Sequence, residues 1–200
     1  VVREERPGLC HARNAGAAAA RAGLLLYIDD DARPAPGWLK AAARELARPG
    51  VVNVGGPIAA LWPAERDAGW PAPGLEALFS VLHRHDADAT LRPPDVVYGA
   101  NWGVRKSALD AVGGFDPAFG PGPGARINGD EVSVAWRLHR AGLGATRFVA
   151  AAAVGHRIPA ERVSERFLVE RALACGIERP RHAVALDGAD RAKLNQGAGG

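Results

Sequence analysis

The sequence predicts an α/β fold, because short apolar runs of strand length alternate with longer stretches that have helical spacing. The clearest strand is Leu24–Ile28, five bulky apolar residues that include an aromatic and a β-branched side chain. Such a run is typical of a strand buried on both faces of a sheet. With 200 residues, of which 48% are hydrophobic and 24% charged, the chain is long enough for one domain with a sizeable core.

The other elements follow from spacing and from the residues that end helices and turns. Val1 and Val2 are expected to close a strand, and helices are expected over residues 9–22, 38–46, 75–82, 106–112, 131–141 and 161–175. Further strands are expected at residues 51–54 and 96–98, with one or two within 146–154. Residues 61–73 and 83–94 are expected to be irregular, and the glycine-rich residues 119–129 to be mobile. We expect one domain over residues 1–180 and a poorly ordered tail over 181–200.

Composition narrows the class of partner. Lys and Arg outnumber Asp and Glu by 25 to 22, a surplus too small to predict nucleic-acid binding. Cys10 and Cys175 form no C-x-x-C motif, which favours a reducing, cytoplasmic location over a disulfide framework or a zinc site. No apolar stretch reaches the roughly 18 residues of a membrane span. Because the chain has no methionine and opens on an apolar pair, we expect it to lack an N-terminal segment.

Three consecutive acids, Asp29, Asp30 and Asp31, directly follow the predicted buried strand. Ligands of open α/β sheets bind beyond the carboxyl ends of the strands, so these acids lie where a site is expected. Crowded carboxylates repel one another, and a divalent cation such as magnesium, manganese or calcium would offset that repulsion. One interpretation is therefore a metal site for a diphosphate, with the remaining acid binding a ribose or sugar hydroxyl. The alternative is an acidic turn, where Asp is common.

A second acidic pair, Asp130 and Glu131, stands at the start of a predicted helix. Acids there complement the helix dipole, which is the structural explanation. The functional interpretation makes Glu131 a general base, kept ionised by the helix end and aimed at a hydroxyl that must lose its proton. His156 follows a predicted strand, where it is either a metal ligand or a histidine satisfied at the strand end.

Two polar pairs could contact a ligand at the same edge. Arg13 and Asn14 either belong to a helix surface or offer hydrogen-bond donors to an anionic ligand. Asn101 and Trp102 lie between two glycines after a predicted strand, where close backbone approach and a flat aromatic face would suit a sugar ring.

Several short motifs occur in a definite order along residues 1–170. They are Gly8-Leu9-Cys10-His11-Ala12-Arg13-Asn14-Ala15-Gly16, Asp29-Asp30-Asp31 with Pro34 and Trp38-Leu39 behind it, Gly99-Ala100-Asn101, Val112-Gly113-Gly114-Phe115-Asp116, Gly129-Asp130-Glu131 with Arg137-Leu138 and Gly142, and His156. In this order and spacing the chain resembles the inverting glycosyltransferases of family 2, which have the GT-A fold. The resemblance implies a Rossmann-like, three-layer α/β/α sheet.

The resemblance also implies a chemistry. Family 2 enzymes use a nucleotide-diphosphate-sugar donor, a divalent cation (Mg²⁺ or Mn²⁺) at an Asp-x-Asp motif, and a single displacement that inverts the anomeric carbon. Asp29 and Asp31 resemble that motif, with Asp31 as the direct metal ligand, and His156 resembles a third residue of the metal site. Glu131 resembles the base that deprotonates the acceptor hydroxyl. The acceptor implied is a carbohydrate or a lipid-linked hydroxyl in cell-wall or polysaccharide synthesis, which would bring the protein to the inner face of a membrane.

The chain departs from the family pattern at two places. Ser133 stands where the family has an acid two residues after the base, and the strand-helix-strand-helix unit that forms much of the nucleobase pocket is not in the sequence. Two other functions therefore stay open at this stage. One is a non-catalytic fragment that binds a sugar or nucleotide, and the other is a metal-dependent nucleotidyltransferase, which would release pyrophosphate.

Overall fold

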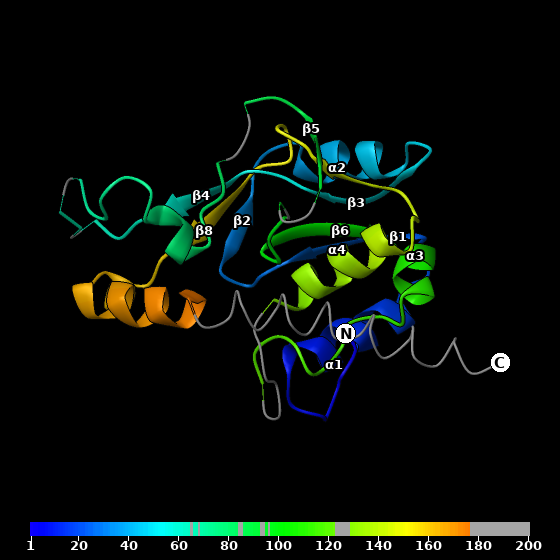
Figure 1. Cartoon of the computed structure of the whole chain (residues 1–200), viewed down its shortest axis with the longest axis horizontal. Helices are drawn as coiled ribbons and strands as arrows, with labels where there is room; N and C mark the ends of the chain where they lie inside the picture. Colours follow the sequence, from blue (N-terminus) through cyan, green and yellow to red (C-terminus); the bar gives the residue numbers. More distant parts are fainter. Residues whose placement is uncertain are drawn as a thin grey trace, which may run out of the picture.

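A five-stranded mixed sheet forms the centre of the molecule in the computed structural model, which describes residues 1–64, 66–67, 69–83, 86–92, 95, 97–122 and 129–176 (Figure 1). Its strand order is β1-β6-β3-β7-β5, and a second sheet has the order β2-β8-β4. The strands are β1 Leu24–Ile28, β2 Ala32–Pro34, β3 Val51–Gly55, β4 Ile58–Leu61, β5 Ala89–Leu91, β6 Asn101–Arg105, β7 Ala145–Phe148 and β8 Val154–Arg157.

Strand directions bring the ends of three strands to one edge of the large sheet. β6 is antiparallel to both β1 and β3, and β7 is parallel to β3. β1, β3 and β7 therefore point the same way, and the acids after Ile28 lie at the edge that their carboxyl ends share. The register places Ile28 opposite Asn101, so the start of β6 lies at that edge as well.

Helices cover both faces of this sheet, which gives the predicted three layers (Figure 1). α2 (Trp38–Leu46) packs on one face, against β1, β3 and β6. α1 (Leu9–Ala19), α3 (Lys106–Ala111) and α4 (Asp130–Arg140) lie on the other side. Since α4 leads into the start of β7, its own first residues lie at the opposite end, which is the edge where the acids of β1 stand.

The main core lies between the layers and includes Leu46, Val54, Trp102, Val134 and Phe148, each at most 1% exposed. These side chains come from α2, β3, β6, α4 and β7, so their burial holds the helices against the sheet. A second cluster forms around Phe79 and Ile158, beside the smaller sheet. It includes the 3₁₀ helix η1 (Glu76–Phe79) and Phe167, which belongs to residues 165–176, all helical.

The irregular segment after β4 is anchored by aromatic rings, as its two tryptophans predict. The rings of Trp62 and Trp70 lie 5.0 and 5.5 Å from that of Phe79, both edge-on.

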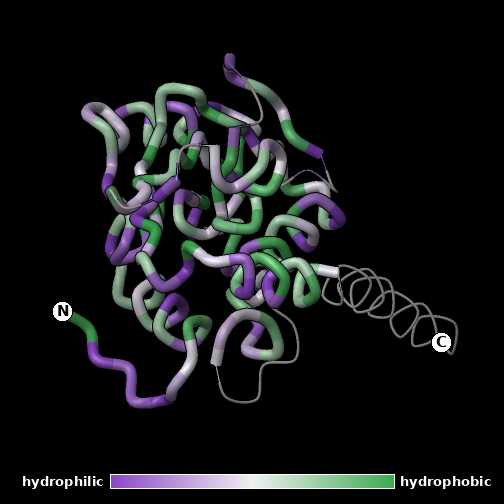
Figure 2. The backbone as a smooth tube through the Cα atoms, turned by 90° about the vertical axis from the view of Figure 1, so that its left-hand side faces the viewer, coloured by the Kyte–Doolittle hydropathy of each residue, from purple (hydrophilic) through white to green (hydrophobic). Residues whose placement is uncertain are grey.

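The backbone tube in Figure 2 shows the first residues of the chain running out from the body of the molecule.

Several local predictions are wrong. The strand expected to be buried on both faces is the edge strand β1, in which only Leu25 is buried, and the helix expected over residues 75–82 is the short 3₁₀ helix η1. Val1 and Val2 are exposed and form no strand. Val97 and Tyr98 of the strand expected at residues 96–98 are not in a strand, which begins only at Asn101, whereas Val96 lies outside the described residues; residues 83–94 contain β5. The predicted final helix is divided, because the 3₁₀ turn η2 (Ala160–Arg162) is followed by a break before residue 165. Residues 123–128 of the predicted mobile loop and the tail 181–200 lie outside the described residues.

Candidate functional site

The acidic run after β1 forms a tight turn into β2. The backbone N–H of Ala32 donates to the carbonyl of Asp29 at 3.0 Å and closes it. Asp29 and Asp31 are partly buried, whereas Asp30 between them is exposed. Two carboxylates of the turn are thus partly buried and the one between them faces solvent.

Asp31 faces His156, 125 positions away in the sequence. His156 lies in β8 directly opposite Ala32 of β2, is 5% exposed, and places Nε2 3.3 Å from Asp31 Oδ2. Its Nδ1 lies 3.0 Å from the carbonyl of Phe79, which can only accept, so Nδ1 carries a proton. In the neutral ring, Nε2 then turns a lone pair toward the Asp31 carboxylate. Two acceptors at this distance need a proton or a cation between them.

The second Asp31 oxygen supports a cation at this place. Asp31 Oδ1 is buried and has no hydrogen-bond partner among the described residues. An orphaned carboxylate oxygen beside an imidazole nitrogen fits a divalent ion such as Mn²⁺ or Mg²⁺. Within the described part of the chain, however, no three His, Cys, Asp or Glu side chains are close enough to hold a metal ion.

Asp29 is not the third member of that cluster, because Arg13 holds it. Arg13 Nη2 lies 3.3 Å from Asp29 Oδ1, and Arg13 Nη1 lies 2.5 Å from Asp130 Oδ2. Burial and the neighbouring Asp31 raise the pKa of Asp29, although Arg13 acts in the opposite direction. The predicted set of Asp29, Asp31 and His156 is thus divided in this structure into an Asp31–His156 pair and an Asp29–Arg13 pair.

Arg13 and Asn14 do not lie free on a helix surface. Arg13 is 7% exposed, and its guanidinium stacks near the rings of Tyr27 and Phe115. The Asn14 side chain donates to the carbonyl of Phe115 at 2.7 Å and accepts from its N–H at 2.8 Å. Both side chains are therefore occupied by protein groups, and the prediction that they offer donors to an anionic ligand finds no support in this arrangement.

The second acidic pair lies in the first turn of α4, as predicted. Asp130 is 2% exposed and ion-paired to Arg13, and Glu131 is partly buried beside it. Burial, reinforced by the charge of Asp130, raises the pKa of Glu131 to about 7, although Arg13 lowers it. The backbone N–H at the helix end favours the ionised form, as expected, but desolvation outweighs it. The result is a carboxyl group that titrates near neutral pH.

The side chains of Asn101 and Trp102 serve the core, which corrects the predicted sugar platform. Trp102 is 1% exposed, and its ring packs 5.4 Å from that of Tyr27. Asn101 is 2% exposed; its side chain accepts from Trp38 Nε1 and donates to the carbonyl of Ala152. Both residues belong to a buried central strand, so neither side chain can offer a face to a sugar ring.

Sequence reasoning missed the backbone groups of the site. The carbonyl of Phe79 orients His156, and the carbonyl of Gly99 lies 3.4 Å from Arg13 Nη2. A backbone carbonyl leaves no mark in the sequence, so of these two groups only Gly99 could have been noticed, as a glycine.

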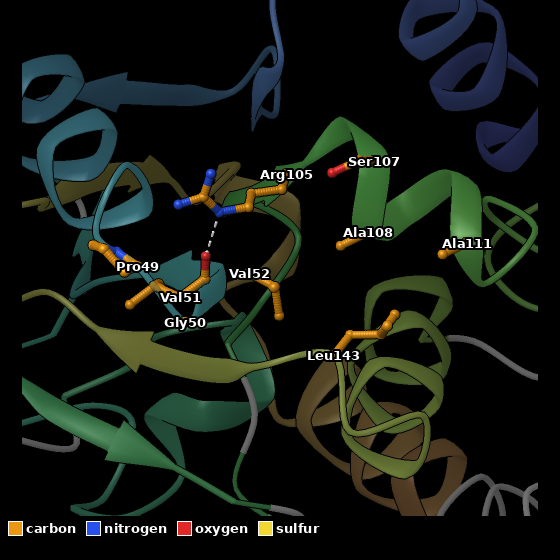
Figure 3. A pocket seen from close by; sticks show the side chains of 9 residues that line it. All are labelled: Pro49, Gly50, Val51, Val52, Arg105, Ser107, Ala108, Ala111 and Leu143. Carbon is orange, nitrogen blue, oxygen red and sulfur yellow. Dashed lines mark hydrogen bonds between the residues drawn. The ribbon is translucent and has the colours of Figure 1, made fainter.

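A cavity of about 420 Å³ lies elsewhere, at the Arg105 end of β6 (Figure 3). Arg105 is hydrogen-bonded there to the carbonyl of Val51, and no carboxylate lines the cavity.

Comparison with known proteins adds a family and a fold. The family model described as glycosyl transferase family 2 matches residues 1–113. GalNAc-T7, solved with UDP, GalNAc and Mn²⁺, superposes with a TM-score of 0.55 at 18% identity over 78% of this chain and 31% of that chain. The mannosyltransferase PcManGT from Pyrobaculum calidifontis, in complex with GDP-Man and Mn²⁺, gives 0.54 at 20% identity over 80% and 39%. A search of curated proteins found no match.

These similarities confirm the predicted GT-A arrangement of the α/β sheet. At such low identity they bear on the fold alone. The chain spans less than half the length of either solved structure.

Proposed function

The chain belongs to glycosyl transferase family 2, and from this membership we propose that the protein transfers a sugar from a nucleotide-diphosphate-sugar to an acceptor hydroxyl. The observation that carries the proposal is the meeting of two acidic sites, about a hundred residues apart in sequence, at one edge of the sheet. Asp29 follows β1, Asp130 begins α4, and Arg13 contacts both. GalNAc-T7 was solved with UDP, GalNAc and Mn²⁺, and PcManGT with GDP-Man and Mn²⁺, which is consistent with a donor of this class.

Glu131 is proposed as the general base of an inverting displacement. The acceptor oxygen attacks the anomeric carbon while the bond from that carbon to the diphosphate oxygen breaks. The bonding electrons leave with the nucleoside diphosphate, and the hydroxyl proton passes to a Glu131 carboxylate oxygen. A base with a pKa of about 7 combines a deprotonated fraction with useful basicity at neutral pH.

Asp31 and His156 are proposed to hold Mg²⁺ or Mn²⁺, while Asp29 stays paired with Arg13 beside them. A divalent ion there would offset the charge that develops on the leaving diphosphate. The exposed Asp30 remains available to a ribose or sugar hydroxyl. Among the described residues, Asp31 Oδ1 is the buried carboxylate oxygen that lacks a partner, so it is the atom best placed to bind a cation.

The acceptor is proposed to be a carbohydrate or a lipid-linked hydroxyl of cell-wall or polysaccharide synthesis, reached from the cytoplasmic face of a membrane. None of the helices formed by the described residues has the length and hydropathy that a membrane crossing requires. Association of the protein with such a membrane is tested by co-sedimentation with vesicles that carry a lipid-linked sugar and with vesicles that lack it.

The deciding experiment titrates UDP, GDP and dTDP calorimetrically into the protein with Mn²⁺ and then with chelator. Saturable binding that chelator abolishes, and that Asp31→Ala removes, is the expected result. Glu131→Gln should bind the same nucleotide but lose about 10²- to 10⁴-fold in turnover of the matching nucleotide-sugar. Full transferase activity in both variants would contradict the assignment. Binding without turnover would indicate a non-catalytic domain, and release of pyrophosphate a nucleotidyltransferase.

A further inference from the structure

Arg13 joins parts of the site that the chain supplies separately. The residue comes from α1, Asp29 from the end of β1, and Asp130 from the start of α4. Its Nη1 contacts Asp130 at 2.5 Å, and its Nη2 contacts both Asp29 at 3.3 Å and the Gly99 carbonyl at 3.4 Å. One rigid, planar group therefore spans both acidic positions.

The surroundings leave this guanidinium little freedom to move. Its central carbon lies 5.9 Å from the centre of the Tyr27 ring and 5.5 Å from that of Phe115. A Cβ atom built on Gly99 would come within 2.8 Å of Arg13 Nη2, so the 99–100 turn closes directly over it. Arg13 and Asp130 are 7% and 2% exposed. The contact between Arg13 and Asp130 is therefore shielded from water, whereas the Asp29 side chain is 39% exposed.

We propose that Arg13 is a positioning residue, which sets the separation between Asp29 on the donor side of the site and Asp130 beside the proposed base. The inference rests on the proposed function. The two forks of an arginine can bind two carboxylates in a fixed relative orientation, whereas a lysine offers one flexible point charge. Arg13 thus couples the strand that carries the Asp-x-Asp pair to the helix that carries Glu131, without itself touching the donor.

The charge balance is consistent with this role. Two carboxylates, Asp29 and Asp130, contact one guanidinium, and Glu131 adds a third nearby acid. A nucleoside diphosphate would add more negative charge at the same edge. Both terminal nitrogens of Arg13 already contact protein oxygens. The guanidinium therefore fixes the distance between the two carboxylates.

Arg13→Lys tests the fork, since it keeps the charge and removes the second arm. We expect turnover to fall about 10- to 100-fold, as small misplacements of reacting groups do. The KM for the nucleotide-sugar and the affinity for the nucleoside diphosphate should stay within about twofold of the wild type. Arg166→Lys is the matched control, because Arg166 forms an exposed ion pair with Glu170. This substitution should leave turnover and nucleotide binding unchanged. Unchanged turnover would overturn the proposal, and so would weaker nucleotide binding at unchanged kcat, which would make Arg13 a donor ligand.

A variant with both partners removed separates positioning from folding. Arg13→Gln with Asp130→Asn removes both ends of the more buried ion pair and leaves only the half-exposed Asp29 without its partner, so its thermal unfolding midpoint should recover in part relative to Arg13→Gln alone. Turnover should stay low. If turnover recovers together with the midpoint, Arg13 is only a structural ion-pair partner and the proposal fails.

A third measurement needs no activity, so it also distinguishes failure of this inference from failure of the proposed function. The effects of Asp29→Asn and Asp130→Asn on the free energy of unfolding should be non-additive when Arg13 is present and additive in the Arg13→Gln background. Additivity in both backgrounds overturns the bridge, even in a protein that transfers no sugar. Non-additivity in a protein that lacks transferase activity would preserve the bridge and refute only the proposed function.

Discussion

Glu131→Gln should make the folded protein more stable at pH 8 while it removes activity. Burial, and then the charge of Asp130, raise the pKa of Glu131 from 4.5 to about 7. Between these two values the folded state binds a proton that the unfolded state has released. Stability therefore falls as the pH rises through this window, and above it the folded state carries the cost of an ionised, partly buried carboxylate.

The size of the effect follows from the pKa change. A rise from 4.5 to about 7 corresponds to about 3 kcal/mol, because each pKa unit is worth about 1.4 kcal/mol. Glutamine has nearly the same shape and no charge to bury. Relative to the wild type, the variant should thus gain about 3 kcal/mol more in free energy of unfolding at pH 8 than at pH 4.

Urea unfolding of wild type and variant at both pH values measures this double difference, in which the titration of all other groups largely cancels. Glu165→Gln provides the matched control, because Glu165 is exposed and the same substitution there should give nearly equal effects at pH 4 and pH 8. Equal effects for Glu131→Gln would refute the reasoning, since they would mean that the folded state pays nothing to ionise this group. The outcome is informative even if no substrate is identified.

Three other substitutions test the fold around the site. Gly56→Ala should strongly destabilise the protein, because the new Cβ would lie 2.2 Å from the Ala152 carbonyl oxygen, whereas Gly16→Ala in α1 meets no atom within 4 Å and should add about 0.5–1 kcal/mol. Thermal unfolding of the two variants compares them directly, and similar midpoints would contradict the packing described. Asn101→Ala should cost about 2–4 kcal/mol in urea unfolding, because it leaves the buried Trp38 Nε1 and Ala152 carbonyl without partners. A loss below about 1 kcal/mol would show that water replaces the amide.

Local pattern was enough to predict most of the scaffold. Leu24–Ile28 is a strand, the acids after it stand at a sheet edge, and Asp130–Glu131 opens a helix, all as expected. These features depend on neighbours in sequence: apolar runs, helical spacing and the residues that end helices. Where the pattern was ambiguous, the predictions failed, as for residues 96–98, because a short valine pair fits a strand or a loop equally well.

The roles of individual side chains depended on contacts that spacing does not contain. The side-chain types of Trp102 and Asn101 would suit a ligand site. In strand β6, however, both side chains point into the core, where burial of a large aromatic ring is favourable. Asn14 could donate to and accept from a ligand, yet its amide instead makes one hydrogen bond of each kind with the backbone of Phe115. Whether such a polar or aromatic side chain lies in the core or at the surface depends on how distant strands and helices pack together.

The sequence by itself determined the family, the α/β class and the positions of the two acidic sites, because these are written in ordered motifs of adjacent residues. Only the tertiary structure decided that Arg13 joins Asp29 to Asp130, that Asp31 faces His156, and that Glu131 titrates near pH 7. Each of these depends on a distance of a few ångströms between groups far apart in the chain, and on how much water remains around them. Both the strength of a charge interaction and the cost of burying a charge follow from that local environment.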